Sequence, residues 1–210
     1  MTARFVTFEG LDGSGKSTHL ARAAEWLRAR GDEVLTTREP GGTPLADAIR
    51  DLFLDPRWQA IDGRVEALLV FASRRQHLVE VIEPTLARGV HVLCDRFTDS
   101  SIAYQGVARG LGLDWVRKLD QLATGGRRPD ATLLFDLDPA EARRRGQKHG
   151  RKGSGPDRLD AESLAFYERV RAGFHQQAHA EPERFHLVTT EDAVDVTWAR
   201  VAEVLAEVFA

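Results

Sequence analysis

Residues 10–17 are the stretch whose residue types and spacing most clearly suit phosphate binding. They read GLDGSGKS, which matches the pattern G-x-x-x-x-G-K-[ST] at every fixed position. Glycines at positions 10, 13 and 15 let the backbone curl so that its N–H groups converge on phosphate oxygens. Lys16 has the charge and reach for β- and γ-phosphates, and Ser17 offers a hydroxyl to Mg²⁺. The predicted nucleotide-binding loop consists of Gly10, Leu11, Asp12, Gly13, Ser14, Gly15, Lys16, Ser17 and Thr18.

A second pair of charged residues follows an apolar run further along the chain. Residues 91–94 read HVLC, and Asp95 and Arg96 come directly after them. An acidic residue at the carboxyl end of a strand suits a metal ion, and a neighbouring arginine suits a second anion. This pair favours phosphoryl transfer to an acceptor over simple hydrolysis. The chain contains no asparagine, so the N-K-x-D motif by which GTPases bind guanine is absent.

Three motifs together resemble those of the thymidylate kinase family of nucleoside monophosphate kinases. Residues 9–18 read EGLDGSGKST, residues 37–43 read TREPGGT, and residues 95–106 read DRFTDSSIAYQG. The resemblance extends from Phe5 to the final helix. It implies phosphoryl transfer from ATP to dTMP, giving dTDP for dTTP biosynthesis, with Mg²⁺ as the cofactor.

The same resemblance implies roles for residues at matching positions. Arg96 corresponds to the arginine that binds the acceptor phosphate, and Asp95 to an aspartate that helps to organise the metal and the acceptor. Tyr104 corresponds to an aromatic ring that crowds the 2′ position of the sugar and favours deoxyribose. The other implied acceptor residues are Arg38 and Glu39, Pro40 near the thymine methyl group, Arg74 and Ser101 at the base, and Gln105.

Two acceptor assignments stay open at this stage. Asp12 either contacts the 3′-hydroxyl of the acceptor or only shapes the loop. The family usually carries a stacking phenylalanine four residues before the arginine at position 74, but position 70 is Val70 and the aromatic residue is Phe71. One residue is about 100° of rotation on a helix, so Phe71 cannot simply replace it. Phe71 is therefore either an acceptor contact or a core residue.

Residues 143–158 form a basic segment, RRRGQKHGRKGSGPDR, in which seven of sixteen residues are Arg or Lys. Its glycines argue against a firm helix, and the alternatives are a solvated loop or a cationic lid. Phosphoryl transfer requires positive charge on the moving group, and the variable positions 11–14 of the nucleotide-binding loop contain no basic residue. We therefore expect a short lid. Arg158 matches a lid motif of the family, and Arg145 and Arg151 are further catalytic candidates beside Lys16, Asp95 and Arg96.

The secondary-structure pattern predicts where these residues lie. β-rich runs occur at 5–9, 33–38, 90–94, 131–137 and 185–189, and stretches with helical spacing separate them. A long helix is expected over 64–88, and a final helix carries apolar residues from 196 to 208. The prediction is an α/β protein with the P-loop NTPase fold, in which helices cover both faces of a five-stranded parallel sheet. Residues 1–210 are expected to form one domain.

Composition sets the remaining expectations. The chain has 210 residues, a net charge of −3, a single cysteine (Cys94) and no long apolar run. We expect a cytoplasmic protein that binds neither membranes nor polymeric nucleic acid. The family resemblance implies a homodimer built on long helices such as 64–88. The rival functions are a kinase for another acceptor and a regulatory nucleotide-binding protein, although Lys16, Arg96 and the lid arginines argue against the second.

Overall fold

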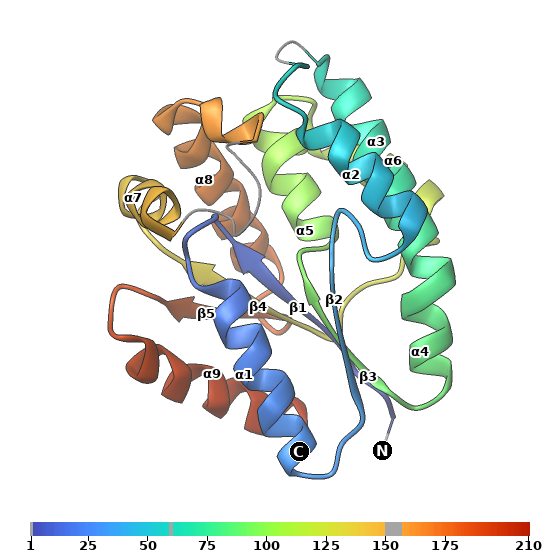
Figure 1. The fold of residues 1–210 in the computed structure, drawn as a ribbon, viewed down its shortest axis with the longest axis vertical. Helices are drawn as coiled ribbons and strands as arrows, with labels where there is room; N and C mark the ends of the chain where they lie inside the picture. The colour runs from blue at the N-terminus through green and yellow to red at the C-terminus, as the bar shows by residue number, and fades with distance from the viewer. Residues whose placement is uncertain (1, 59–60, 150–156) are drawn as a thin grey trace.

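The computed structural model describes residues 2–58, 61–149 and 157–210, and it is built around one parallel sheet (Figure 1). Five strands lie side by side in the order β2-β3-β1-β4-β5, and all the neighbouring pairs are parallel. This confirms the predicted fold class. The strands are β1 (Phe5–Gly10), β2 (Val34–Arg38), β3 (His91–Asp95), β4 (Ala131–Asp136) and β5 (Phe185–Thr189).

The helices cover both faces of the sheet. α1 and α9 pack on one face, where Leu27 and Leu205 join the side chains of Val6 and Phe8 in one core. α8 and the segment after α3 cover the other face. The helices are α1 (Lys16–Ala29), α2 (Pro44–Leu54), α3 (Gly63–His77), α4 (Glu83–Ala87), α5 (Thr98–Ser101), α6 (Leu113–Thr124), α7 (Pro139–His149), α8 (Leu164–Ala180) and α9 (Val194–Val208), with shorter turns η1 (Leu78–Ile82), η2 (Ile102–Ala108) and η3 (Leu159–Ala161).

The carboxyl ends of the strands form the edge where the charged motifs meet. Both chain termini lie at the opposite end of the molecule, while α2, α5 and α8 gather above the carboxyl ends (Figure 1). Open parallel sheets bind ligands at this edge. Within the described part of the chain, no helix combines the length and apolar character needed to cross a membrane.

The helix expected over 64–88 is not regular along its length. Its middle part, η1, is a π-helical turn between α3 and α4. Pro84 stands at the start of α4 and has no N–H to donate to the carbonyl four residues earlier. A wider turn before the proline accommodates that missing bond.

The expectation that residues 143–158 contain no firm helix is wrong for their first part. α7 runs from Pro139 to His149 and so includes residues 143–149. Asp138 begins the helix, because its carboxylate accepts two backbone N–H groups of the first turn. Glu141 then bonds Arg144 and Arg145 one turn later, at 2.6 and 2.7 Å. Local capping and ion pairs therefore outweigh the low helical propensity of the glycine in this segment.

Gly10, at the end of β1, provides a test of the sheet packing next to the nucleotide-binding loop. Its φ is +132°, and a Cβ atom there would overlap the carbonyl oxygen of Phe135 in β4. We expect Gly10→Ala to lower the free energy of unfolding by about 3 kcal/mol in urea titrations, because two backbones must separate. Gly31→Ala is the control: φ is also positive, but no atom lies within 4 Å of the added Cβ. That variant should lose only about 1 kcal/mol, and equal losses in the two variants would contradict the packing argument.

Candidate active site

The nucleotide-binding loop joins β1 to α1 in a conformation that glycine makes possible. Gly13 and Gly15 have φ angles of +85° and +92°, which L-residues with side chains rarely adopt. The Lys16 side chain is buried, and its Nζ donates a hydrogen bond to the carbonyl oxygen of Leu11 at 2.9 Å. Burial, with a smaller contribution from the charge of Arg96, lowers the pKa of Lys16. The ammonium group therefore lies within the loop that would surround the phosphates.

Helix α7 packs directly on this loop. A Cβ atom on Gly13 would overlap the carbonyl oxygen of Ala142 and would lie 3.0 Å from the amide nitrogen of Gly146. The two backbones therefore approach each other without intervening side chains. This contact places the first part of the basic segment against the donor loop.

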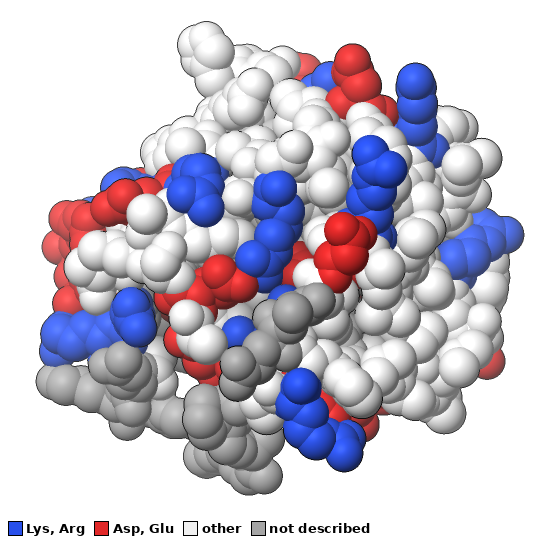
Figure 2. Space-filling model, turned by 90° about the horizontal axis from the view of Figure 1, so that it is seen from above, with Lys and Arg blue, Asp and Glu red and all other residues white. Residues whose placement is uncertain are grey.

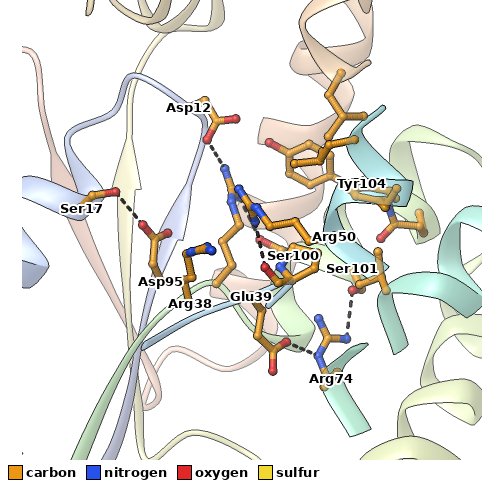
Figure 3. A pocket seen from close by; sticks show the side chains of 17 residues that line it. Asp12, Ser17, Arg38, Glu39, Arg50, Arg74, Asp95, Ser100, Ser101 and Tyr104 are labelled. Atoms are coloured by element: carbon orange, nitrogen blue, oxygen red, sulfur yellow. Dashed lines mark hydrogen bonds and ion pairs between the residues drawn. The ribbon is translucent and has the colours of Figure 1, made fainter. Parts of the chain in front are cut away.

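Ser17 and Asp95 come together at the start of α1 and the end of β3. The Ser17 hydroxyl donates to Oδ2 of Asp95 at 2.6 Å (Figure 3). A hydroxyl and a carboxylate are hard oxygen ligands of the kind that Mg²⁺ prefers. These two residues could hold a magnesium ion.

Arg96 follows β3 in a left-handed backbone conformation, with φ of +74°. This conformation is uncommon for a residue other than glycine and is found at functional sites. Its guanidinium group donates to Asp12 at 2.7 Å and to the Ser100 hydroxyl at 3.0 Å, and it lies 5.3 Å from the centre of the Tyr104 ring. The turn therefore aims a positive charge from β3 back toward the nucleotide-binding loop.

Glu9, the residue before that loop, fixes the turn that carries Arg96. Its side chain has no exposed surface. Its carboxylate accepts hydrogen bonds from the Phe97 amide at 2.7 Å and from the Ser100 hydroxyl at 2.6 Å. Burial, with a smaller contribution from Asp99, raises the pKa of Glu9 to about 7. One buried carboxylate thus connects the central strand to the acceptor side of the site.

A cavity of about 300 Å³, the candidate acceptor cavity, opens between these elements (Figure 3). Seen from above, this end of the molecule has basic and acidic side chains interspersed (Figure 2). The cavity brings together residues that are far apart in the chain. The sequence-predicted residues in its lining are Asp12, Ser17, Arg38, Glu39, Pro40, Arg74, Asp95, Arg96, Ser101, Tyr104 and Gln105.

Arg74 is held in this cavity wall by three hydrogen bonds and two aromatic rings. Its Nε donates to Glu39 at 2.7 Å, and its two terminal nitrogens donate to the Ser101 hydroxyl and the Phe97 carbonyl, both at 3.0 Å. The guanidinium carbon Cζ lies 4.6 Å from the centre of the Phe71 ring and 5.1 Å from that of the Phe97 ring. A charged group that is 1% exposed is therefore paired and fully oriented.

Phe71 lies in the core and not in the lining of the acceptor cavity. Its ring packs with Ile102 and Val116, whereas Val70 faces the cavity. This corrects the prediction of Phe71 as an acceptor contact. The reason is the rotation per residue of α3, which turns position 71 away from the side that position 70 presents.

Tyr104 and the surrounding aromatic rings form the wall opposite Arg74. Its ring meets Phe166 and Phe174 edge to face, with centroids 6.1 and 6.4 Å apart. Its hydroxyl is buried and has no hydrogen-bond partner among the described residues. Burial raises the pKa of Tyr104 to about 12, so the phenol stays protonated at neutral pH.

The predicted lid arginine at position 158 occupies an unexpected place. Arg158 is buried and donates to Glu66 at 2.7 Å and to the carbonyl oxygen of Phe53 at 3.1 Å. The same Glu66 carboxylate accepts from Gln105 at 2.8 Å and pairs with Arg109 at 3.1 Å. The structure therefore places Arg158 in a buried ion cluster beneath the acceptor cavity and not among the donor-loop residues.

Of the other two lid candidates, Arg145 lies within the described residues and Arg151 does not. Arg145 donates to the Glu141 carboxylate at 2.7 Å and to the carbonyl oxygen of Thr190 at 2.8 Å. It projects from α7, the helix that contacts the nucleotide-binding loop. Arg151 lies outside the described residues.

Sequence reasoning missed several cavity residues. Arg50, Phe53 and Leu54 line the cavity from α2, and Leu159 from η3. No motif marks them. The three α2 residues reach the site because α2 packs along α3. Glu66 was also missed, because only the fold brings Gln105, Arg109 and Arg158 together around it.

His77 is a further residue that the sequence did not mark. It has no exposed surface, and it bonds Glu39 at 3.0 Å and the Thr37 hydroxyl at 2.7 Å. It thereby supports the carboxylate that orients Arg74.

A phosphate-binding loop facing an arginine-lined acceptor cavity, at the carboxyl edge of a parallel sheet, defines a P-loop nucleoside monophosphate kinase. A family model for thymidylate kinase matches residues 8–201. Curated thymidylate kinases of Cupriavidus metallidurans and Geobacter sulfurreducens are each 47% identical to the chain; the first match covers 98% of this chain and 99% of the relative, the second 96% and 95%. The crystal structure of thymidylate kinase from Ehrlichia chaffeensis matches with a TM-score of 0.79 at 36% identity, over 98% of this chain and 100% of that one. The chain belongs to the thymidylate kinase family.

Glu9 makes stability depend on pH in a defined direction. Because its folded pKa of about 7 lies above the usual 4.5, the folded state binds more protons between these values. Stability from this group is therefore fully present below pH 4.5 and is lost as pH rises through 7. We therefore expect the free energy of unfolding of the wild type, measured relative to that of Glu9→Gln, to fall by a few kcal/mol between pH 4.5 and 8. The size follows from the raised pKa, since each unit of pKa difference between the folded and unfolded states corresponds to roughly 1.4 kcal/mol. Urea unfolding of both proteins across this range measures it, and a constant or rising difference would contradict the raised pKa.

Proposed function

We propose that this chain transfers the γ-phosphoryl group of ATP to dTMP, giving dTDP, in the cavity between the nucleotide-binding loop and α3. The observation that carries the proposal is that all three family motifs meet in one lining. Asp12 and Ser17 come from the first motif, Glu39 and Pro40 from the second, and Arg96 to Gln105 from the third. A nucleotide-binding loop alone would also suit hydrolysis, but the arginine-lined cavity beside it suits a phosphorylated acceptor.

On the donor side, residues 10–18 bind the ATP phosphates through their backbone N–H groups and the start of α1. Lys16 leaves the Leu11 carbonyl, to which it is bonded at 2.9 Å, and neutralises the β- and γ-phosphates. Ser17 and Asp95 would hold Mg²⁺, which would supply positive charge that offsets the charge of the phosphates.

On the acceptor side, Arg96 binds the phosphate of dTMP in place of the Asp12 carboxylate. The Asp12 side chain is 43% exposed, so water can solvate it when Arg96 leaves. We assign Asp12 to the 3′-hydroxyl of the sugar. Arg74 and Ser101, already bonded to each other, face the base together with Gln105. Pro40, Glu39 and Arg38 complete the wall around the base and the phosphate, and Tyr104 occupies the space beside the sugar.

The reaction is an in-line displacement. An oxygen of the dTMP phosphate forms a bond to the γ-phosphorus, while the bond from that phosphorus to the bridging oxygen of ADP breaks. The protein contributes orientation and positive charge, and no covalent intermediate is needed. We assign Arg145 to the moving phosphoryl group, since it projects from α7, which rests on the donor loop. Arg151, outside the described residues, remains a second lid candidate from the sequence. Arg158 we assign to positioning, because it is bonded to Glu66.

We also propose that the chain forms a homodimer in the cytoplasm. Large apolar side chains are exposed on three neighbouring helices: Leu45 and Leu52 on α2, Val65 and Leu68 on α3, and Leu122 on α6. An exposed apolar surface of this kind supports a subunit interface. The only cysteine, Cys94, is buried and unpaired, which suits a reducing compartment.

The proposed function is tested by an assay of ADP release with ATP and Mg²⁺. The acceptors are dTMP, dUMP, dCMP, dGMP, dAMP, ribothymidine monophosphate and thymidine, supplied one at a time. We expect strong turnover with dTMP, and kcat about a hundredfold lower in Lys16→Ala, the scale of losing one charge-stabilising donor. Turnover on thymidine, or equally on several monophosphates, would overturn the acceptor. ATP binding without turnover on any acceptor would favour a regulatory protein.

Tyr104 should set the preference for deoxyribose. We expect Tyr104→Ala to raise kcat/KM for ribothymidine monophosphate relative to dTMP by about tenfold, because the ring no longer excludes a 2′-hydroxyl. Tyr104→Phe is the matched control, since the hydroxyl has no hydrogen-bond partner in the described structure. It should keep the wild-type preference. An unchanged preference in Tyr104→Ala would remove this residue from sugar selection.

A further inference from the structure

A buried carboxylate beneath the acceptor cavity connects α3 to the end of η2 and the start of η3. Glu66 lies in the first turn of α3 and has no exposed surface. It pairs with Arg158 at 2.7 Å and with Arg109 at 3.1 Å. Arg109 also pairs with Glu162, at 2.6 Å. Two carboxylates thus face two guanidinium groups, and the charges of these four residues balance within the cluster.

Glu66 determines which way the amide of Gln105 is turned. Its Oε1 accepts a hydrogen bond from Nε2 of Gln105 at 2.8 Å. An ionised carboxylate accepts hydrogen bonds and donates none, so the amide nitrogen of Gln105, and not its oxygen, has to face Glu66. Arg109 and Arg158 likewise offer only N–H donors, so every one of these bonds uses Glu66 as a hydrogen-bond acceptor.

The carbonyl oxygen of Gln105 is therefore turned away from Glu66. Gln105 belongs to the lining of the acceptor cavity. Its Oε1 accepts no hydrogen bond from the described residues, and it retains accessible surface, in contrast to the fully buried hydroxyl of Tyr104. The amide thus offers a hydrogen-bond acceptor that a ligand in the cavity can reach.

The neighbouring polar groups of this wall are donors. Arg74 has N–H groups only, and the Ser101 hydroxyl, which accepts from Arg74 at 3.0 Å, keeps its own proton for a ligand. Thymine has one ring N–H group, at N3, between two carbonyl oxygens. Two donors and the carbonyl oxygen of Gln105 complement that edge. Cytosine has a lone pair at N3 and an amino group in place of the O4 oxygen, so it does not match.

We propose that Glu66 is a positioning residue that makes the site select bases with a ring N–H group, because it holds the carbonyl oxygen of Gln105 toward the base. This inference rests on the proposed function, since it takes the base of the acceptor nucleotide to lie against Gln105. Glu66 itself touches no ligand. Cytosine is then rejected because it leaves polar groups of the site opposed or unpaired, which discriminates more strongly than a lost apolar contact.

The substitution Glu66→Gln should reverse the amide of Gln105. The terminal nitrogens of Arg109 and Arg158 both bond Oε2 of Glu66, whereas Gln105 bonds Oε1. The arginines need a hydrogen-bond acceptor, so they retain the carbonyl oxygen of the new amide, and its NH₂ group faces Gln105. The amide of Gln105 then has to turn over and presents its own NH₂ group to the cavity, where it suits N3 of cytosine.

Titration calorimetry without ATP measures this reversal. dUMP and dCMP are compared because they differ only at positions 3 and 4 of the ring. We expect Glu66→Gln to lower the ratio of the Kd of dCMP to that of dUMP at least about tenfold relative to the wild type, since a matched hydrogen bond replaces an opposed one. An unchanged ratio would overturn the proposal.

Two comparisons separate this effect from a general loss of structure. dUMP and dTMP share the ring N–H group, so the ratio of their Kd values should be the same in Glu66→Gln and in the wild type. Glu162→Gln is the matched variant: it removes the same charge from the same cluster but leaves the bond between Glu66 and Gln105 in place. It should keep the wild-type ratio for dCMP and dUMP. A fall as large as in Glu66→Gln would overturn the proposal, because the charge of the cluster would then control the ratio.

The double variant Glu66→Gln/Gln105→Glu should restore the selection. The new carboxylate at position 105 accepts from the new NH₂ group at position 66 and offers only hydrogen-bond acceptors to the base. This variant keeps the charge of the cluster, so it also tests the proposal if Glu66→Gln alone does not fold. We expect a ratio of the Kd of dCMP to that of dUMP at or above the wild-type value, and a ratio well below it would overturn the proposal. Failure of the wild type to bind dTMP would instead contradict the proposed function, so the two failures are distinguishable.

Discussion

The buried carboxylate of Glu9 connects the two halves of the site. It stands at the end of the central strand, one residue before the nucleotide-binding loop, and it accepts the Phe97 amide and the Ser100 hydroxyl from the turn after β3. The donor loop and the acceptor turn are therefore fixed relative to each other by a group with no exposed surface. Burial strengthens such bonds and makes their loss expensive, so small errors in this geometry are strongly disfavoured. The left-handed conformation of Arg96 persists because this turn is held at both ends.

The arginines in and beneath the acceptor cavity differ in how firmly they are held. Arg74 and Arg158 are bonded to carboxylates with almost no exposure, those of Glu39 and Glu66. Breaking such pairs would leave a buried charge without compensation, so these arginines are part of the framework. Arg96 pairs instead with Asp12, whose side chain is 43% exposed. Because the Asp12 carboxylate is partly solvated, Arg96 can exchange it for another anion more easily than Arg74 or Arg158 can exchange its partner. Arginine thus serves both as a fixed part of the cavity framework and as a ligand-binding group. An arginine whose carboxylate partner is buried belongs to the framework, and one whose partner is exposed can bind the ligand.

Much of the fold was predictable from the sequence, because its signals are local. The alternation of apolar strands and helices gave the five parallel strands, and the motifs gave the loop and the turn after β3. The errors occur where tertiary contacts decide. Nothing in the local sequence shows that Glu66 bonds both Arg109 and Arg158, so the lid motif alone predicts a phosphate contact for position 158. Likewise the pattern around Phe71 does not say which side of α3 faces the cavity. The helical part of 143–158 depends on Asp138 and Glu141, which lie before the segment considered.

The backbone contact between Gly13 and α7 restricts where a catalytic cation can come from. Any side chain at position 13 would overlap the Ala142 carbonyl oxygen, so a basic residue in that part of the loop and α7 in its observed position are mutually exclusive. A chain with this packing cannot place a basic side chain at position 13, so positive charge on the moving phosphoryl group beyond that of Lys16 must come from other elements, and α7 is the basic helix that packs on the loop. Close packing at this glycine thus makes a basic residue at position 13 and the observed position of α7 alternatives. A substitution that introduces the first must displace the helix.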